Sequence, residues 1–159
     1  MTENGIEQTI FRYALAYDKN DMDMLVSCFA EDGVLITPAG AAQHHELRKD
    51  DVAFMGGTEP VRGLTAIRAF QAKARNRRSE LGHQPRHAIT NVRIEHTASG
   101  VSVTSYLTLF ITQSDGKSFL DHTGLYLDQM VEVHGQWKIK ERRISIDSDQ
   151  NFPGRKNLT

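Results

Sequence analysis

The chain has 159 residues, of which 39% are hydrophobic and 25% are charged, and its formal net charge at pH 7 is −1. These values are typical of one globular domain, and the near-neutral charge argues against a general nucleic-acid-binding protein, which would carry a basic excess. The single cysteine, Cys28, excludes an internal disulfide and a cysteine-rich zinc site, and we expect it to be a buried packing residue.

No apolar run approaches the roughly 20 residues of a membrane span. The first residues lack the basic and apolar regions of a secretory signal. We therefore expect a cytoplasmic protein, with one domain over residues 1–149 and a polar C-terminal tail over residues 150–159.

The N-terminal third predicts two helices and a strand. A helix over residues 3–17 is indicated by apolar side chains at three- and four-residue steps, namely Ile6, Ile10, Tyr13, Ala14 and Tyr17. Asn20 and Asp21 are capping residues for a second, short helix. A turn at Asp32-Gly33 then leads to a short strand over residues 34–37.

Residues 38–62 are broken by glycine and proline, although their middle, residues 45–54, could hold a short helix. A loop this long inside a compact domain is often functional, so we expect residues 39–62 to close over a pocket. The adjacent His44 and His45 would point opposite ways on an extended chain, which argues against a shared metal ion.

A third helix is predicted over residues 64–80, with an apolar stripe and a basic face. The basic face comprises Arg68, Lys73, Arg75, Arg77 and Arg78. Its simplest interpretation is a solvated surface, and the alternative is a site for an anion or an acidic partner.

Residues 86–147 predict four long strands, because three glycine turns separate runs rich in β-branched and apolar residues. Such a meander, following helices, indicates an α+β fold with a twisted, curved sheet. Two strands change their alternation. This predicts a bulge near Thr90 and, between Ile139 and Ile144, either a second bulge or a strand covered on both faces. Apolar residues at both odd and even positions also predict a homodimer or higher homo-oligomer through the outer face of the sheet.

The residues that could carry chemistry form a constellation rather than a standard motif. Asp18 ends the first apolar stripe, where burial would raise its pKa, and His87 opens a strand. Taken singly, a capping aspartate and a packed histidine explain them as well. Tyr106, His122 and Tyr126 share even parity on adjacent strands and could line one wall.

Several segments together resemble the SnoaL-like proteins of the nuclear-transport-factor-2-like superfamily, over about residues 6–147. They are Tyr17-Asp18-Lys19-Asn20-Asp21, Asp32-Gly33, Gly63-Leu64, Arg86-His87-x-x-x-Asn91, Gly124-x-Tyr126-x-Asp128 and Gly135-x-Trp137-Lys138-Ile139. The resemblance implies a cone-shaped α+β barrel, in which a curved antiparallel sheet wraps around three helices and a pocket opens at the wide end.

Within that superfamily the chain resembles the scytalone dehydratases and hexachlorocyclohexane dehydrochlorinases, which use an aspartate–histidine pair deep in the pocket. The resemblance implies Asp18 and His87 as that pair and Tyr17 as a functional tyrosine. A second histidine of the dehydratases is missing, because Ile111 stands near its place, and this argues against scytalone-type dehydration. Residues expected to bind substrate are Tyr13, Phe54, Tyr106, His122 and Tyr126.

The resulting hypothesis is an enzyme without cofactor or metal, acting on a small, largely apolar molecule of aromatic, polyketide or steroid type. His87 would abstract a proton, and elimination or isomerisation would follow. Lyase, isomerase and cyclase activities stay open, because they differ in pocket shape rather than in the base. The alternative is a non-catalytic subunit or ligand-binding module, such as the small subunit of a ring-hydroxylating dioxygenase.

Overall fold

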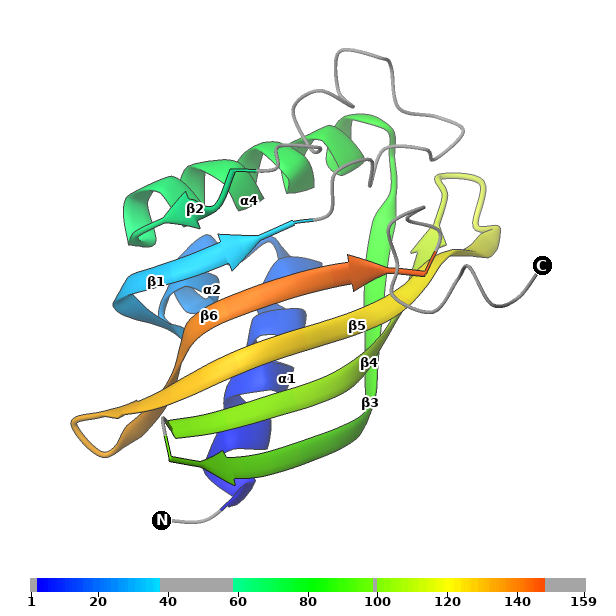
Figure 1. The fold of residues 1–159 in the computed structure, drawn as a ribbon. Coiled ribbons are helices and arrows are strands. Elements are labelled where there is room, and N and C mark those ends of the chain that lie inside the picture. The colour runs from blue at the N-terminus through cyan, green and yellow to red at the C-terminus, as the bar shows by residue number, and fades with distance from the viewer. Residues whose placement is uncertain (1–2, 38–58, 99, 148–159) are drawn as a thin grey trace.

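The computed structural model describes residues 3–37, 59–98 and 100–147. Helices α1 (Glu3–Lys19), α2 (Met22–Val26) and α4 (Leu64–Glu80) lie on one side of a curved, six-stranded sheet (Figure 1). The strands lie in the order β2-β1-β6-β5-β4-β3 and comprise β1 (Phe29–Ile36), β2 (Val61–Arg62), β3 (Gln84–Thr97), β4 (Gly100–Thr112), β5 (Ser118–Val133) and β6 (Gln136–Ile146). The predicted α+β fold is confirmed.

The sheet is mixed rather than wholly antiparallel as expected, because β1 runs parallel to its neighbour β6. Strands β3 to β6 form the predicted antiparallel meander, and the sheet stays open between β2 and β3. Asp32-Gly33 is not a turn before a strand but part of β1, at a register shift between Phe29 and Val34. The predicted loop closure, the helix over 45–54 and the tail fall largely or wholly outside the described residues.

Helix α1 fills the concave side of the sheet, where Ile6, Ile10 and Tyr13 are almost completely buried. It ends two residues later than the sequence predicts, and Asp21 then caps α2 by accepting a 2.9 Å hydrogen bond from the backbone N–H of Met24. Cys28 is buried, as expected. In the described part of the chain, no helix has the length and apolar character needed to cross a membrane.

Bulges set which side chains face the helices. In β3 the register shifts between Thr90 and Arg93, and Asn91 takes the left-handed conformation with φ 52°. This confirms the bulge predicted near Thr90 and gives His87 and Val92 the same face despite their opposite parity. In β6 a second shift places an extra residue, Lys140, between the paired Ile139 and Glu141.

The pairing of β4 with β5 corrects one assumption about the two faces of the sheet. Ser105 pairs with Tyr126, so odd positions of β4 share a face with even positions of β5. Leu107 is therefore buried inside, whereas Tyr106 and Leu127 lie on the outer face, 53% and 36% exposed. Apolar side chains do occupy both faces, but in a different grouping from the one that parity alone predicts.

Candidate active site

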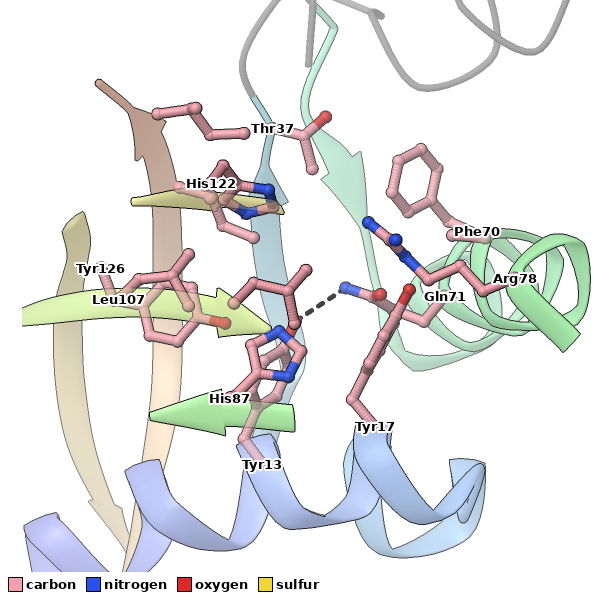
Figure 2. A pocket seen from close by; sticks show the side chains of 14 residues that line it. Tyr13, Tyr17, Thr37, Phe70, Gln71, Arg78, His87, Leu107, His122 and Tyr126 are labelled. Carbon is pink, nitrogen blue, oxygen red and sulfur yellow. Dashed lines mark hydrogen bonds between the residues drawn. The ribbon is translucent and has the colours of Figure 1, made fainter. Parts of the chain in front are cut away.

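A cavity of about 80 Å³ lies between the C-terminal half of α1, helix α4 and the concave face of the sheet (Figure 2). Its walls are largely apolar, and both the helices and the sheet contribute polar side chains to them. The lining residues are Tyr13, Tyr17, Thr37, Phe70, Gln71, Ala74, Arg78, His87, Leu107, Leu109, His122, Tyr126, Ile144 and Ile146. The volume is roughly half of the 150 Å³ of a cavity that holds a benzene molecule.

Asp18 and His87 form a buried pair at this cavity. Nδ1 of His87 lies 2.6 Å from Oδ1 of Asp18, and the backbone N–H of His87 donates a 2.9 Å hydrogen bond to Oδ2. Both side chains are only 8% exposed. The two side chains are therefore within hydrogen-bond reach of each other. Because the carboxylate accepts from Nδ1–H, the neutral imidazole presents Nε2 as its acceptor.

Burial lowers the pKa of His87 below its ordinary value of 6.5, although the hydrogen bond and charge of Asp18 oppose this shift. The neighbouring His122 and Arg78 lower the pKa of His87 further, because they disfavour a second positive charge. His87 is therefore neutral at neutral pH, which is the state that a general base requires.

Tyr17 links this pair to a second group of polar side chains. Its ring meets the His87 ring edge to face, with 5.2 Å between centroids. Burial raises the pKa of Tyr17, and the nearby positive charge of Arg78 opposes that rise. The phenol therefore stays protonated and can donate to a ligand.

Tyr13 and Tyr126 form part of the cavity wall, and Arg142 packs against both rings. The guanidinium of Arg142 lies 4.1 Å from both ring centroids and binds Asp128 through two hydrogen bonds of 2.6 and 2.7 Å. Both residues of this ion pair are fully buried. The Tyr13 hydroxyl accepts a 2.7 Å hydrogen bond from Gln71, and burial raises the pKa of both phenols. The two rings are thus neutral, rigid surfaces.

Arg78, Asp121 and His122 form the second polar group. The sequence interpretation missed Asp121 and placed Arg78 on a basic helix face, with an anion site only as the alternative. Oδ2 of Asp121 lies 3.0 Å from Nη2 of Arg78 and 2.9 Å from Nδ1 of His122. Asp121 is the extra residue of a bulge in β5, because Leu109 pairs with His122 and Phe110 with Leu120. Such a bulge allows two successive side chains to turn to the same side of a strand.

The predicted basic face of α4 is not one surface. Arg75 is buried and donates a 3.2 Å hydrogen bond to the carbonyl of Tyr17, and the Arg78 side chain is only 12% exposed. A sequence signal for Arg78 exists: it continues the buried stripe of Ile67, Gln71 and Ala74 at steps of three and four.

The structure brings together most of the predicted site residues. Asp18, His87, Tyr17, Tyr13, His122 and Tyr126 lie at or beside one cavity. Tyr106 does not, since the β4–β5 register turns its side chain to the outer face, and its predicted place on this wall is wrong. Phe54, His44 and His45 lie outside the described residues. Within residues 3–37, 59–98 and 100–147, no group of three or more His, Cys, Asp or Glu side chains could hold a metal ion.

This arrangement joins an oriented base to hydrogen-bond donors inside a mostly apolar cavity. Such a site can remove a proton from carbon and stabilise the charge that results.

Comparisons with known proteins agree with the fold. ActVI-ORFA from Streptomyces coelicolor is similar over 91% of this chain and 94% of its own, with a TM-score of 0.74 and 15% identity. A candidate scytalone dehydratase from Novosphingobium aromaticivorans gives a TM-score of 0.63 at 20% identity, covering 90% of this chain and 82% of its own.

The beta subunit of a candidate aromatic-ring-hydroxylating dioxygenase from the same organism gives a TM-score of 0.63 at 18% identity, covering 92% and 89%. At these identities the likeness concerns the fold. No curated protein sequence matches the chain. Residues 2–143 match the SnoaL-like domain, and the chain therefore belongs to the SnoaL-like family.

Proposed function

We propose that the chain is a cofactor-independent enzyme that removes a proton from carbon in a small, largely apolar molecule. The observation that carries this proposal is the buried 2.6 Å contact between Asp18 and His87 beside an apolar cavity. A histidine whose pKa is lowered by burial, and whose Nδ1 is fixed by a carboxylate, is suited to act as a general base.

In this mechanism Nε2 of His87 takes the proton, and Asp18 stabilises the imidazolium that forms. The Tyr17 hydroxyl donates a hydrogen bond to the atom of the substrate on which negative charge develops. The electron pair left on carbon then expels a leaving group from the neighbouring carbon, or the imidazolium returns its proton to another carbon. The first outcome is an elimination and the second an isomerisation.

Exchange of carbon-bound hydrogen with solvent deuterium tests the base without knowledge of the natural substrate. We expect the protein to catalyse deuterium uptake at the carbon next to the carbonyl of acetophenone or 2-tetralone, followed by NMR. His87→Gln should reduce the rate by about 10²–10⁴-fold, the range typical of a general base. Asp18→Asn should reduce it too, and the double variant should lose less than the product of both effects, because the two residues act together.

His96→Gln is the matched control, because His96 is an exposed histidine on the same strand, β3. It should exchange the probes at the unaltered rate. Full exchange activity in His87→Gln would remove His87 as the base.

The second candidate is a ligand-binding or non-catalytic subunit, as in the dioxygenase beta subunit that shares the fold. It predicts probe binding without any deuterium uptake, and co-purification with a larger partner. The filled Asp18–His87 pair favours the enzyme, since a purely structural subunit has no need of an oriented base.

We also propose that two copies associate through the outer face of the sheet. Exposed apolar side chains gather there, among them Tyr106, Phe110 and Leu120.

A further inference from the structure

The side of the cavity nearest α4 carries a cation that the proposed proton transfer does not use. Arg78 extends from α4 toward the same space as the hydroxyl of Tyr17 (Figure 2). It is ion-paired with Asp121, and the two side chains are only 12% and 6% exposed. A largely buried guanidinium beside a ligand cavity needs an account of both its charge and its donors.

Asp121 holds the guanidinium in place without using all its donors. Nη2 donates to Asp121 at 3.0 Å, and the Tyr17 hydroxyl lies beside the guanidinium (Figure 2). A guanidinium has five N–H groups, so in the described part of the chain this ion pair leaves N–H groups for a ligand. The group is fixed before any ligand arrives, as electrostatic stabilisation of a developing charge requires.

Tyr17 also sets the position of Arg78 relative to the base. The Tyr17 and His87 rings meet edge to face with 5.2 Å between their centroids, while the Tyr17 hydroxyl points toward Arg78 (Figure 2). An oxygen atom that accepts from both Tyr17 and Arg78 would therefore lie a short distance from the proton that His87 removes. The neighbouring cation also polarises the phenol and strengthens the hydrogen bond that the phenol donates.

We propose that Arg78, held by Asp121, is a catalytic residue that binds a carbonyl oxygen of the substrate together with Tyr17. The substrate is accordingly a ketone or aldehyde. The proton that His87 removes lies on the carbon next to that carbonyl. As the C–H bond breaks, its electron pair moves toward the carbonyl oxygen, which becomes an enolate oxygen paired with Arg78. This inference rests on the proposed function for the identity of the base.

The competing interpretation is that Arg78 only ties α4 to β5 through Asp121. A pair of probes of similar shape separates the two: 4-nitrophenolate, which carries an oxygen anion on a ring as an enolate does, and nitrobenzene, which does not. Dissociation constants are measured by calorimetry for the full chain.

Arg78→Met should weaken 4-nitrophenolate binding by about 10- to 100-fold, the effect of losing a charge-assisted hydrogen bond. Nitrobenzene affinity should change less than twofold. The 4-nitrophenolate affinity of Arg78→Lys should lie between that of the parent and that of Arg78→Met. Because Arg78→Met leaves a buried carboxylate behind, Arg78→Met/Asp121→Asn provides a variant that removes both charges. Arg77→Met, on the same helix and beside Glu80, is the matched control and should bind both probes as the parent does.

Equal losses for both probes would assign Arg78 a structural role, and unaltered 4-nitrophenolate binding in both Arg78 variants would exclude it as an oxygen-binding group. The base is tested separately by deuterium exchange. His87→Gln should keep the preference for 4-nitrophenolate while losing exchange, so failure of the base and failure of the oxygen site give different results.

Discussion

Asp18 acts on His87 in two ways. It stabilises the protonated imidazole through its charge, and it holds Nδ1–H so that Nε2 is left as the acceptor. Burial works against the first effect and keeps the base neutral. The balance between them sets the pH range in which the site can accept a proton.

Replacing Asp18 by Asn should lower the pKa of His87 further. The substitution removes the hydrogen bond and charge that raise this pKa and leaves the desolvation that lowers it. Titration of the His87 ring protons by NMR in both proteins measures the difference. An unaltered or higher pKa in Asp18→Asn would contradict the electrostatic account.

The rate of deuterium exchange should be constant above about pH 6.5 and should fall as the pH decreases through the lowered pKa of His87. The free energy of unfolding should also fall as the pH decreases, because the unfolded chain binds a proton at His87 at a higher pH than the folded protein does. The contribution of neutral His87 to stability is present above pH 6.5 and is lost as the pH falls. A rate maximum on the acidic side of this range would contradict the assignment.

At the scale of elements, bulges decide what the cavity contains. The bulge at Asn91 aligns His87 with the core-facing side of β3, and the bulge at Asp121 turns two polar residues inward on β5. Neither strand could present these groups in a regular alternation.

Asn91→Val should lower the free energy of unfolding by about 1–2 kcal/mol, because a β-branched residue is strained at the φ of 52° found there. It should also reduce deuterium exchange, since a relaxed bulge shifts the register of His87. Urea unfolding measures the stability and NMR measures the exchange. Asn91→Gly should keep the stability and the exchange rate that Asn91→Val loses, because glycine accepts this φ.

His134→Val is the control for strain alone. His134 has a similar φ of 49°, but it lies in the turn between β5 and β6 and does not line the cavity. It should lose similar stability and keep exchange. Equal loss of exchange in both Val variants would remove any special role of the Asn91 bulge.

The meander and the three main helices could be predicted from sequence, because glycine turns and apolar spacing are local signals. The bulge near Thr90 followed from the conflict between His87 and Val92. The parallel pairing of β1 with β6 could not be predicted, because it joins distant segments and leaves no local pattern. Arg78 was assigned to a surface since charge outweighed its place on the buried stripe, and Tyr106 was misplaced because parity cannot fix the register between strands.

At the scale of the molecule, the outer face of the sheet carries an apolar surface. Tyr106, Phe110 and Leu120 are 53%, 43% and 53% exposed there, and Phe110 pairs directly with Leu120. Exposed apolar side chains grouped in this way commonly mark an association surface.

The protein should sediment as a homodimer at micromolar concentration, and Tyr106→Lys should shift it toward the monomer by placing a charge in the buried interface. Leu15→Lys, at a 47% exposed position on α1, is the control and should leave assembly unaltered. A monomeric parent protein under these conditions would exclude the interface.

The parallel pairing of β1 with β6 has a consequence for folding during synthesis. Strand β1 is made well before β6, one of its two partners in the sheet, so on the ribosome this pairing must wait until β6 has emerged. Contacts between such distant segments form slowly. The wall of the cavity that Ile144 and Ile146 supply is therefore completed only after β6 has been made, and a nascent chain that lacks β6 has no finished pocket in which to hold a ligand.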